Sequence, residues 1–296
     1  MALIPPSFID CVVALGKTKP DGPVHWGASG FFYGKFFEEG PEPDMSVYKV
    51  YLVTNRHVLA GSDQVSIRVN PQGAGQARDF IASLSDPSTE EKLWYGHDDD
   101  QVDVAVLPIN FQLLLDEGME VSMFTSDATS LDVSAMKESQ VSEGDFVYAL
   151  GFPLGLVGEE RNTVIVRSGT IARVRETFDN PRYRFLVDAV IFPGNSGGPI
   201  VTKPELIAIK GTGAKTDARL IGIVSGYVPY QDMAVSSQTN RIRVIFEENS
   251  GLTTVYSVDC INEAIDALVK SVSGDSPQEA EPQPVDEPSL VREEKG

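Results

Sequence analysis

Short apolar runs alternate with turn-forming residues along most of the chain. The runs are rich in Val, Ile, Phe and Tyr and are bounded by Gly, Pro, Asp and Asn, a pattern typical of β-strands. They include GFFYGKFF (30–37), YKVYLVT (48–54), QVSIRV (64–69), VDVAVLPI (102–109), DFVYALGFP (145–153), TVIVRSGTIARV (163–174), YRFLVDAVI (183–191), GPIVT (198–202), LIGIVSGYV (220–228) and RIRVIF (241–246). An apolar stretch at 8–15 predicts a first strand before them. Because no helical segments alternate with these runs, the pattern favours an all-β barrel or sandwich over a parallel α/β sheet.

One helix is predicted, near the end of the chain at about 258–272. Its apolar positions follow helical spacing and Ser257 or Asp259 could cap it; they are Ile261, Ile265, Leu268, Val269 and Val272. The strands divide into two halves, at about 8–125 and 145–250, with a polar linker at 126–144. We therefore expect one domain over 1–272, followed by an acidic tail rich in Pro and Glu at 273–296 that is disordered.

Composition and charge narrow the function classes. The chain has 296 residues, 42% of them hydrophobic, and a net charge of −19. The tail holds seven acids and two bases, so residues 1–272 still carry −14. A negative electrostatic field with no stripe of basic residues argues against binding to nucleic acid. No apolar run reaches 18 residues, so no membrane span is predicted.

The two cysteines, Cys11 and Cys260, lie at opposite ends of the chain and form no metal-binding motif. The first twenty residues lack a basic segment followed by a clean apolar core, so they do not resemble a secretory signal. We expect two reduced, buried thiols, a cytoplasmic location, and no metal or other cofactor.

The segment VIFPGNSGGPIV (190–201) presents Ser196 among glycines. It fits a tight turn, the nucleophile elbow of an α/β-hydrolase, or the nucleophile of another serine hydrolase. A serine hydroxyl needs a base, and all three histidines precede Ser196. Because an α/β-hydrolase places its histidine after its serine, that interpretation is excluded.

His57 is the candidate base, because it follows the apolar run YLVT at a strand end, where a loop residue can face a cleft. His25 and His97 are interpreted as surface or structural histidines. Asp103 is the candidate orienting acid, since it opens an apolar strand. Asp98, Asp99 and Asp100 form an acidic loop whose adjacent carboxylates lack the alternating spacing of a calcium loop.

The chain order His57, Asp103, Ser196 matches the chymotrypsin arrangement of this chemistry. A subtilisin order would need an acid before His57, together with helices that this region does not show. With these residues in place, the sequence resembles a trypsin/chymotrypsin-fold serine protease, and more closely the HtrA-like protease domain. The resemblance runs over nearly all of 8–272, through the segments GASGFF (27–32), LVTNRHVL (52–59), DVAVLPI (103–109), ALGFPLGL (149–156), VRSGTIARV (166–174), VDAVIFPGNSGGPIV (187–201), LIGIVSGY (220–227) and SVDCINEAI (257–265).

This resemblance implies two six-stranded antiparallel barrels with the triad between them. The chain is expected to depart from the HtrA branch in that a short acidic tail, and no PDZ domain, follows the helix. The resemblance implies an oxyanion hole from the backbone N–H groups of Gly194 and Ser196. The chain departs from the family at Arg56, where relatives carry a small or polar residue, and in the insertions EEGPEPDMS (38–46) and NPQGAGQARD (70–79).

The resemblance also places Val190 at the base of the primary specificity pocket, and Ser225, Gly226 and Tyr227 along its wall. Val190 offers no carboxylate to a basic side chain, so we expect cleavage after small or medium apolar residues. Asn195 stands where trypsin-like zymogens have the aspartate that pairs with a new N-terminus, which predicts regulation by loop ordering, a partner or substrate binding instead.

The sequence thus predicts a serine endopeptidase acting on proteins or peptides. Two alternatives stay open: a catalytically silent peptide-binding module of the same fold, and an esterase using the same triad.

Overall fold

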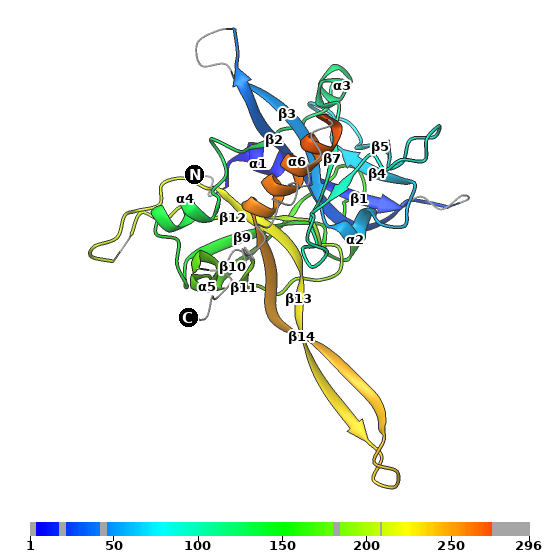
Figure 1. Ribbon diagram of the computed structural model, residues 1–296, viewed down its shortest axis with the longest axis vertical. Coiled ribbons are helices and arrows are strands. Elements are labelled where there is room, and N and C mark those ends of the chain that lie inside the picture. The colour runs from blue at the N-terminus through cyan, green and yellow to red at the C-terminus, as the bar shows by residue number, and fades with distance from the viewer. Residues whose placement is uncertain (1–3, 18–21, 42–45, 180–183, 208, 274–296) are drawn as a thin grey trace, which may run out of the picture.

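The computed structural model describes residues 4–17, 22–41, 46–179, 184–207 and 209–273. Of the expected tail at 273–296, only Ser273 lies within the described residues, and part of the 38–46 insertion lies outside them. The chain forms two β units side by side, and helix α6 (Val258–Ser273) packs across them (Figure 1). A mostly β fold with a C-terminal helix was predicted from the strand-like runs and is confirmed.

The N-terminal unit is a curled sheet of eight strands in the order β5-β4-β1-β2-β3-β7-β6, with β8 parallel to β2. The strands are β1 (Val12–Lys17), β2 (His25–Glu39), β3 (Ser46–Thr54), β4 (Gln64–Val69), β5 (Arg78–Ser83), β6 (Tyr95–Gly96), β7 (Ala105–Pro108) and β8 (Phe124–Thr125). Three short helices accompany them, α1 (Pro6–Asp10), α2 (Arg56–Leu59) and α3 (Phe111–Asp116). The strand expected at 8–15 therefore begins only at Val12, because Pro5 and Pro6 start a helical turn that buries Phe8.

The resemblance implied a second six-stranded barrel here; the structure has instead a curled eight-stranded sheet that stays open, within the trypsin-like fold that was predicted. The sheet curls far enough for the Leu93 N–H to reach the Leu84 carbonyl at 3.0 Å, but β5 stays an edge strand. On the opposite edge, β6 pairs only with Ala105 and Val106 of β7. Pro108 ends β7 and has no N–H to donate, so pairing cannot continue along that edge.

The C-terminal unit is a closed barrel of six strands in the order β10-β11-β14-β13-β12-β9. Its strands are β9 (Phe146–Gly151), β10 (Ile165–Arg173), β11 (Arg184–Asp188), β12 (Pro199–Thr202), β13 (Leu220–Val235) and β14 (Ile242–Ser257), with helices α4 (Val133–Glu138), η1 (Pro153–Gly155) and α5 (Arg175–Asp179) around them. The polar linker thus contains a helix, α4, whose N-terminus is capped by the side chain of Asp132.

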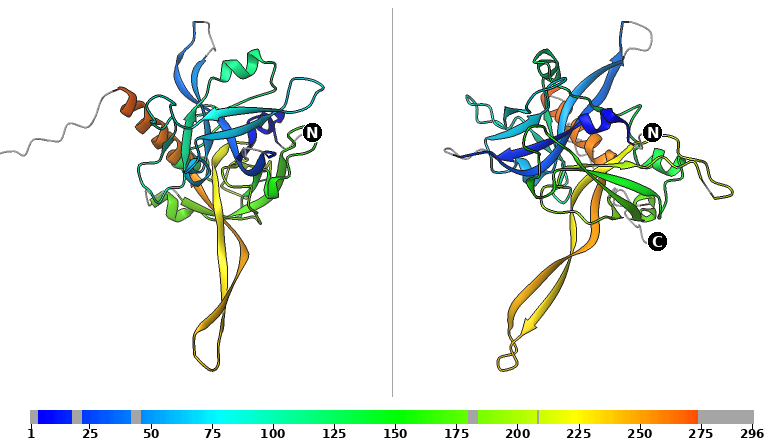
Figure 2. Two further views of the ribbon diagram at one scale, coloured as in Figure 1. Left: turned by 90° about the vertical axis from the view of Figure 1, so that its right-hand side faces the viewer. Right: turned by 180° about the vertical axis from the view of Figure 1, so that it is seen from behind.

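The two runs LIGIVSGYV and RIRVIF belong to one long hairpin, β13–β14. Its base closes the barrel and its distal part extends far from the body in every view (Figures 1 and 2).

The two units share a hydrophobic core. One cluster contains Phe31 and Val104 from the N-terminal sheet, Phe152 and Ile223 from the barrel, and Ile261 from α6. Each unit also has a cluster of its own. Since apolar burial is shared across the seam, the two halves pack as one body and can hold side chains from both in a fixed relation.

Candidate active site

His57 lies on the N-terminal side of the seam. It belongs to α2, which begins two residues after β3, so the strand end presents the imidazole outward with 55% of the side chain exposed. Its Nδ1 lies 2.7 Å from Oδ2 of Asp103, and its backbone N–H donates to Oδ1 of the same carboxylate at 3.1 Å. The carboxylate thus fixes both ring and backbone. With Nδ1 engaged, Nε2 is the nitrogen left to exchange a proton with a substrate or nucleophile.

Asp103 lies two residues before β7 and is held from three sides. The Asn55 amide donates to its carbonyl oxygen at 2.6 Å, and the Ser225 hydroxyl lies 3.4 Å from Oδ2. Its side chain is one quarter exposed, so the acid is partly shielded rather than fully buried. Two residues upstream, the Gln101 carbonyl accepts a hydrogen bond from the Tyr256 hydroxyl at 2.5 Å, which anchors this loop to the barrel.

Arg56 organises the acidic loop beside the site. Its guanidinium pairs with Asp100 at 2.7 Å and donates to the His97 carbonyl. His97 in turn bonds to Glu263 of α6 at 2.8 Å, so it acts as a structural histidine, as its sequence context indicated. The departure from the family at Arg56 therefore neutralises part of an acidic loop and ties it to α2.

Ser196 lies in the turn between β11 and β12, on the C-terminal side of the seam. Gly194 takes φ +103°, which favours glycine, and a Cβ there would lie 2.3 Å from the Phe152 carbonyl oxygen. The Pro193 carbonyl accepts a hydrogen bond from the Leu154 N–H at 2.6 Å. Because the peptide is trans, the Gly194 N–H points to the opposite side, away from η1. Such an N–H is available to an oxyanion.

Asn195 is fully buried under this turn. Its Oδ1 accepts the Phe192 N–H at 3.1 Å, and its carbonyl accepts the Gly198 N–H at 2.9 Å. The side chain that replaces a zymogen aspartate is therefore used within the turn itself, and it is uncharged.

Ser29 of β2 joins the nucleophile turn to the N-terminal sheet. Its hydroxyl donates to the Gly194 carbonyl at 2.7 Å and accepts the Phe152 N–H at 3.0 Å. Its backbone N–H donates to the Ser196 carbonyl at 2.9 Å. Sequence reasoning did not assign this role. The only signal was a small polar residue inside the apolar run GASGFF, and its partners lie more than 120 residues away.

Ser225 is the residue that brings the triad candidates together. Its carbonyl accepts the Ser196 hydroxyl at 3.2 Å, while its own hydroxyl faces Asp103. Ser196 and Asp103 thus both contact Ser225 on β13. The sequence placed Ser225 in the specificity pocket but did not foresee its contact with the acid.

The other predicted pocket residues lie around Thr253 of β14. Thr253 pairs with Tyr227 on β13, and its hydroxyl donates at 2.7 Å to the carbonyl of Ala189, the neighbour of Val190. Val190 itself is exposed. Gly226, next to Tyr227, has no atom within 4 Å of a Cβ built on it, so the space beside this strand is open.

A small cavity of about 240 Å³ lies on the other side of His57. Its lining is mostly apolar and includes Leu15, Ala28, Val58 and Val65, with Lys17 and His25 among them. His25, interpreted from the sequence as a surface histidine, is exposed and lies beside the candidate base.

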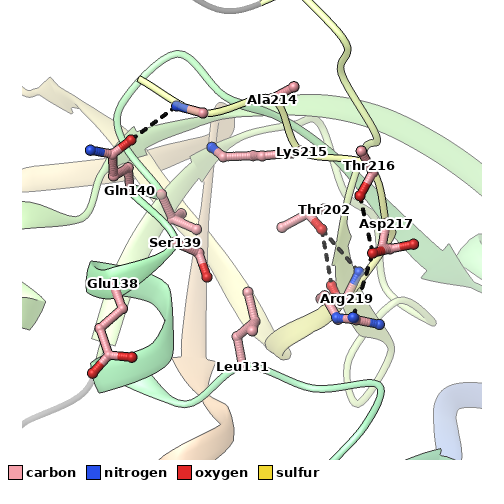
Figure 3. Close-up of a pocket in the computed structure, with 12 residues that line it drawn as sticks. Leu131, Glu138, Ser139, Gln140, Thr202, Ala214, Lys215, Thr216, Asp217 and Arg219 are labelled. Carbon is pink, nitrogen blue, oxygen red and sulfur yellow. Dashed lines mark hydrogen bonds and ion pairs between the residues drawn. The ribbon is translucent and has the colours of Figure 1, made fainter. Parts of the chain in front are cut away.

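A polar cavity of about 310 Å³ lies elsewhere, beneath the loop that precedes β13 (Figure 3). The polar groups around it bond to one another: Gln140 accepts the Gly213 N–H at 3.2 Å, Thr202 accepts the Arg219 N–H at 2.9 Å, and Lys215 pairs with Asp145. These contacts fasten the loop to the barrel, and the triad candidates do not line the cavity.

Cys11 and Cys260 are free and buried, as predicted. Burial raises the pKa of the Cys260 thiol to about 12 and that of the Cys11 thiol well above its usual range, so both stay protonated at neutral pH. Within the described ranges, no three or more His, Cys, Asp or Glu side chains gather to hold a metal ion. Nor does any helix in those ranges have the length and apolar character needed to cross a bilayer.

The family follows from comparison with known proteins. The model of the trypsin-like peptidase domain matches residues 28–209, which is more than half of the chain. The chain belongs to the trypsin-like peptidase family. The predicted serine-type endopeptidase class is therefore confirmed at the level of the family, whose substrates are proteins or peptides.

Curated relatives carry names of the HtrA branch, also as predicted. A protein of Marinomonas sp. (strain MWYL1) named "Probable periplasmic serine endoprotease DegP-like" is 25% identical over 244 residues, 77% of this chain and 43% of the relative. "Serine protease Do-like HtrB" of Bacillus subtilis (strain 168) is 29% identical over 160 residues, 52% of this chain and 27% of the relative. The chain thus spans less than half the length of the curated relatives it matches.

Two solved structures are similar to this chain at low sequence identity. An HtrA-type protease AlgW variant with a tripeptide is 21% identical with a TM-score of 0.46, covering 88% of this chain and 61% of that one. The MamO protease domain from Magnetospirillum magneticum is 17% identical with a TM-score of 0.43, covering 86% and 96%.

The expectation of a cytoplasmic location is wrong. Relatives from Marinomonas, Halomonas elongata and Hahella chejuensis are all named as periplasmic enzymes. The expectation relied on the residue types of the first twenty residues, and the names of these relatives overturn it.

Proposed function

We propose that this peptidase cleaves peptide bonds with Ser196 as nucleophile, His57 as general base and Asp103 as the acid that orients the base. The observation that carries the proposal is the pair of hydrogen bonds between His57 and Asp103. Hydrogen bonds of Ser225 to Asp103 and to Ser196 connect this pair to the nucleophile. In this arrangement Asp103 keeps a proton on Nδ1 of His57, so Nε2 is free to accept the Ser196 proton.

For attack, the Ser196 hydroxyl turns from the Ser225 carbonyl toward His57. This is a rotation about one side-chain bond, and catalytic hydrogen bonds commonly tighten only when substrate is bound. The hydroxyl oxygen adds to the peptide carbonyl as its proton passes to Nε2. The protonated imidazole then gives that proton to the leaving amine, and an acyl-enzyme is left for hydrolysis by water.

The developing oxyanion is bound by the N–H groups of Gly194 and Ser196. The orientation of the Pro193–Gly194 peptide supports this assignment, because the bond from Leu154 holds the Pro193 carbonyl away from that position. The donors are in place before substrate arrives, so binding the oxyanion requires no rearrangement of the turn.

Substrate residues before the scissile bond lie along Ser225, Gly226 and Tyr227, with Val190 at the base of the primary pocket. Because the residue at the bottom of this pocket is uncharged, the pocket favours small or medium apolar side chains. Discrimination between such side chains is about 1–3 kcal/mol per methylene group. The apolar cavity beside His57 accommodates the residue after the scissile bond. Strict cleavage after Arg or Lys in a peptide library would contradict this assignment.

We further propose that the protease domain comprises residues 1–272, that the enzyme acts in the periplasm or outside the cell, as its relatives' names suggest, and that its activity is regulated. Asn195 supports regulation without a new N-terminus. A buried amide bonded within its own turn offers no charge for an amino group to pair with.

The test is cleavage of an unfolded protein by the wild type and by Ser196→Ala, with the new termini mapped. Loss of the nucleophile of a serine protease lowers turnover by roughly 10⁶-fold, so we expect no cleavage above background from the variant. Equal activity of the two proteins would overturn the assignment. Cleavage of esters but not of peptides would identify an esterase, and no turnover by either protein would identify a silent binding module.

A further inference from the structure

The distal part of the β13–β14 hairpin is an exposed two-stranded ribbon, called here the arm and comprising residues 229–248. It is paired along its length, from Pro229 with Asn249 to Val235 with Ile242. All of its residues except Ser236 are exposed. Figure 2 shows it extending away from the body from two further directions.

The arm is apolar for a surface this exposed. Seven large hydrophobic side chains are each at least 47% exposed: Tyr230, Met233, Val235, Ile242, Val244, Ile245 and Phe246. Side chains alternate along a strand, so Ile245 and Phe246 face opposite sides and both faces of the ribbon are apolar. An isolated two-stranded hairpin is marginally stable in water, and contiguous exposed apolar surface usually marks an interaction site.

The same chain carries an apolar slot that could receive such a ribbon. The slot lies where the N-terminal sheet fails to close, between β5 and the β7–α3 connection, and has a volume of about 390 Å³. Its lining includes Phe80, Ile81, Leu93, Leu107, Leu113 and Leu114. Three of these, Ile81, Leu93 and Leu113, are exposed, and β5 also offers an unpaired strand edge.

Charge favours contact between copies. The arm tip, residues 234–244, contains Arg241 and Arg243 and no acid, whereas the three acids of the arm lie nearer its base and the chain as a whole carries −19. Helix α3, which lines the slot, ends in Asp116; the next residue, Glu117, already pairs with Arg78 at 2.8 Å. A basic, apolar tip is therefore drawn toward the acidic body of a neighbouring copy.

We propose that the arm of one copy docks into the slot of a second copy of this chain. The arm extends from the C-terminal barrel away from β5 and α3 (Figure 1), whose residues line the slot, so a chain does not fill its own slot. The contact joins two different surfaces, which makes the assembly head-to-tail, a closed ring or an open chain. The arm's twenty residues match one side of a standard interface, about 20–30 residues.

An extended substrate bound along the arm fits the observations less well. A peptide strand would pair with one edge and would leave the two apolar faces in water. A folded partner with an apolar slot covers a face and an edge together.

The test measures the mass of the full chain in solution by light scattering over a range of concentrations, and is independent of catalysis. The arm variant is Ile245→Glu with Phe246→Glu, and the slot variant is Ile81→Glu with Leu113→Glu. All four positions are exposed, so each variant is expected to fold, as circular dichroism would verify. The matched control is Leu206→Glu, an exposed apolar residue in another loop.

We expect the wild type and the control to have at least twice the chain mass of 32.1 kDa, and both variants to be monomers. Mixing the two variants should restore dimers only, because the slot variant keeps its arm and the arm variant keeps its slot. A monomeric wild type at every concentration would overturn the proposal. So would loss of assembly in the arm variant alone, which indicates arm-to-arm contact, or arm substitutions that impair only the cleavage of long substrates.

Discussion

The two halves of the molecule hold their parts of the candidate site in different ways. The C-terminal barrel is closed, and its nucleophile turn is fixed by backbone hydrogen bonds around Gly194 and Asn195. The N-terminal sheet is open, and its contribution, His57, is more than half exposed and is held mainly by Asp103. The oxyanion side is thus built into the backbone, whereas the base depends on side-chain contacts. Ser29 and Ser225 connect the two across the seam.

Among changes that leave both Ser196 and His57 in place, the largest effect is expected at Asp103, the carboxylate that holds His57. Replacing Asp103 by Asn keeps the shape but favours the wrong tautomer of His57, which in a comparable triad lowers kcat by about 10⁴-fold. Steady-state kinetics on a peptide substrate would measure this. An Asp99→Asn control in the neighbouring acidic loop should retain activity within a few-fold. An equal loss of kcat in both variants would contradict the assignment of Asp103 as the orienting acid.

On the barrel side, Gly194→Ala tests a backbone requirement. The new Cβ would lie 2.3 Å from the Phe152 carbonyl oxygen at a φ that alanine avoids, so the turn must shift and one oxyanion donor is lost. We expect kcat to fall by about 10²–10³-fold with KM much less changed.

The matched control is Gly118→Ala, which also has a positive φ but has no atom within 4 Å of the new Cβ. It should lose a little stability and retain turnover. If both alanine variants kept full turnover, the proposed oxyanion turn would be contradicted.

The seam itself is tested by Ser29→Ala. This change leaves the Gly194 carbonyl and the Phe152 N–H without their shared partner, at about 1–3 kcal/mol in the free energy of unfolding. We expect lower kcat in addition, because the hydroxyl holds the nucleophile turn. Ser130→Ala removes another inward-facing hydroxyl, bonded to the Thr125 carbonyl at 2.8 Å, and should reduce stability without altering kcat. An identical kinetic profile for the two variants would make Ser29 a purely structural residue.

The smallest effect concerns stability far from the site. The N–H groups of Val174 and Arg175 donate to Glu143 at 3.0 and 3.1 Å and lower the pKa of its carboxyl to about 2. The carboxyl binds its proton more weakly in the folded state, so its contribution is present above the unfolded pKa of about 4.5 and is lost as pH falls toward 2. After allowance for solvent screening we expect about 1–2 kcal/mol.

Urea unfolding at pH 6 and pH 3 would measure this contribution. Glu143→Gln keeps an acceptor for the two N–H groups but cannot titrate, so its stability should vary less between the two pH values. The same pH dependence in the variant would assign the effect to other carboxyls.

The sequence predicted the parts of this molecule that are encoded locally. Strand periodicity, the apolar stripe of α6 and the order of His57, Asp103 and Ser196 are all properties of short segments or of chain order. The contacts made by Ser29 and the position of Ser225 against Asp103 depend on residues more than 100 positions away, so no local pattern carries them.

The open edge of the N-terminal sheet and the arm were missed for a related reason. Whether the sheet closes depends on how its two edges, near β5 and β7, approach each other in space. Pro108 limits strand pairing at one edge only after β7 has paired with β3. The twelve residues PYQDMAVSSQTN (229–240) separate the two apolar runs LIGIVSGYV and RIRVIF, which are therefore interpreted as independent strands. Their extension into solvent as a single ribbon is set by the barrel strands at its base.

The central claim is that Ser196 is an activated nucleophile assembled across the seam. The most direct measurement is labelling by a fluorophosphonate probe, with the modified residue located by mass spectrometry, because the probe reacts only with a serine whose hydroxyl is activated. We predict one adduct, on Ser196, that disappears in Ser196→Ala and is strongly reduced in His57→Ala. An adduct on another serine, or labelling of Ser196 that is unaffected by the loss of His57, would contradict the account.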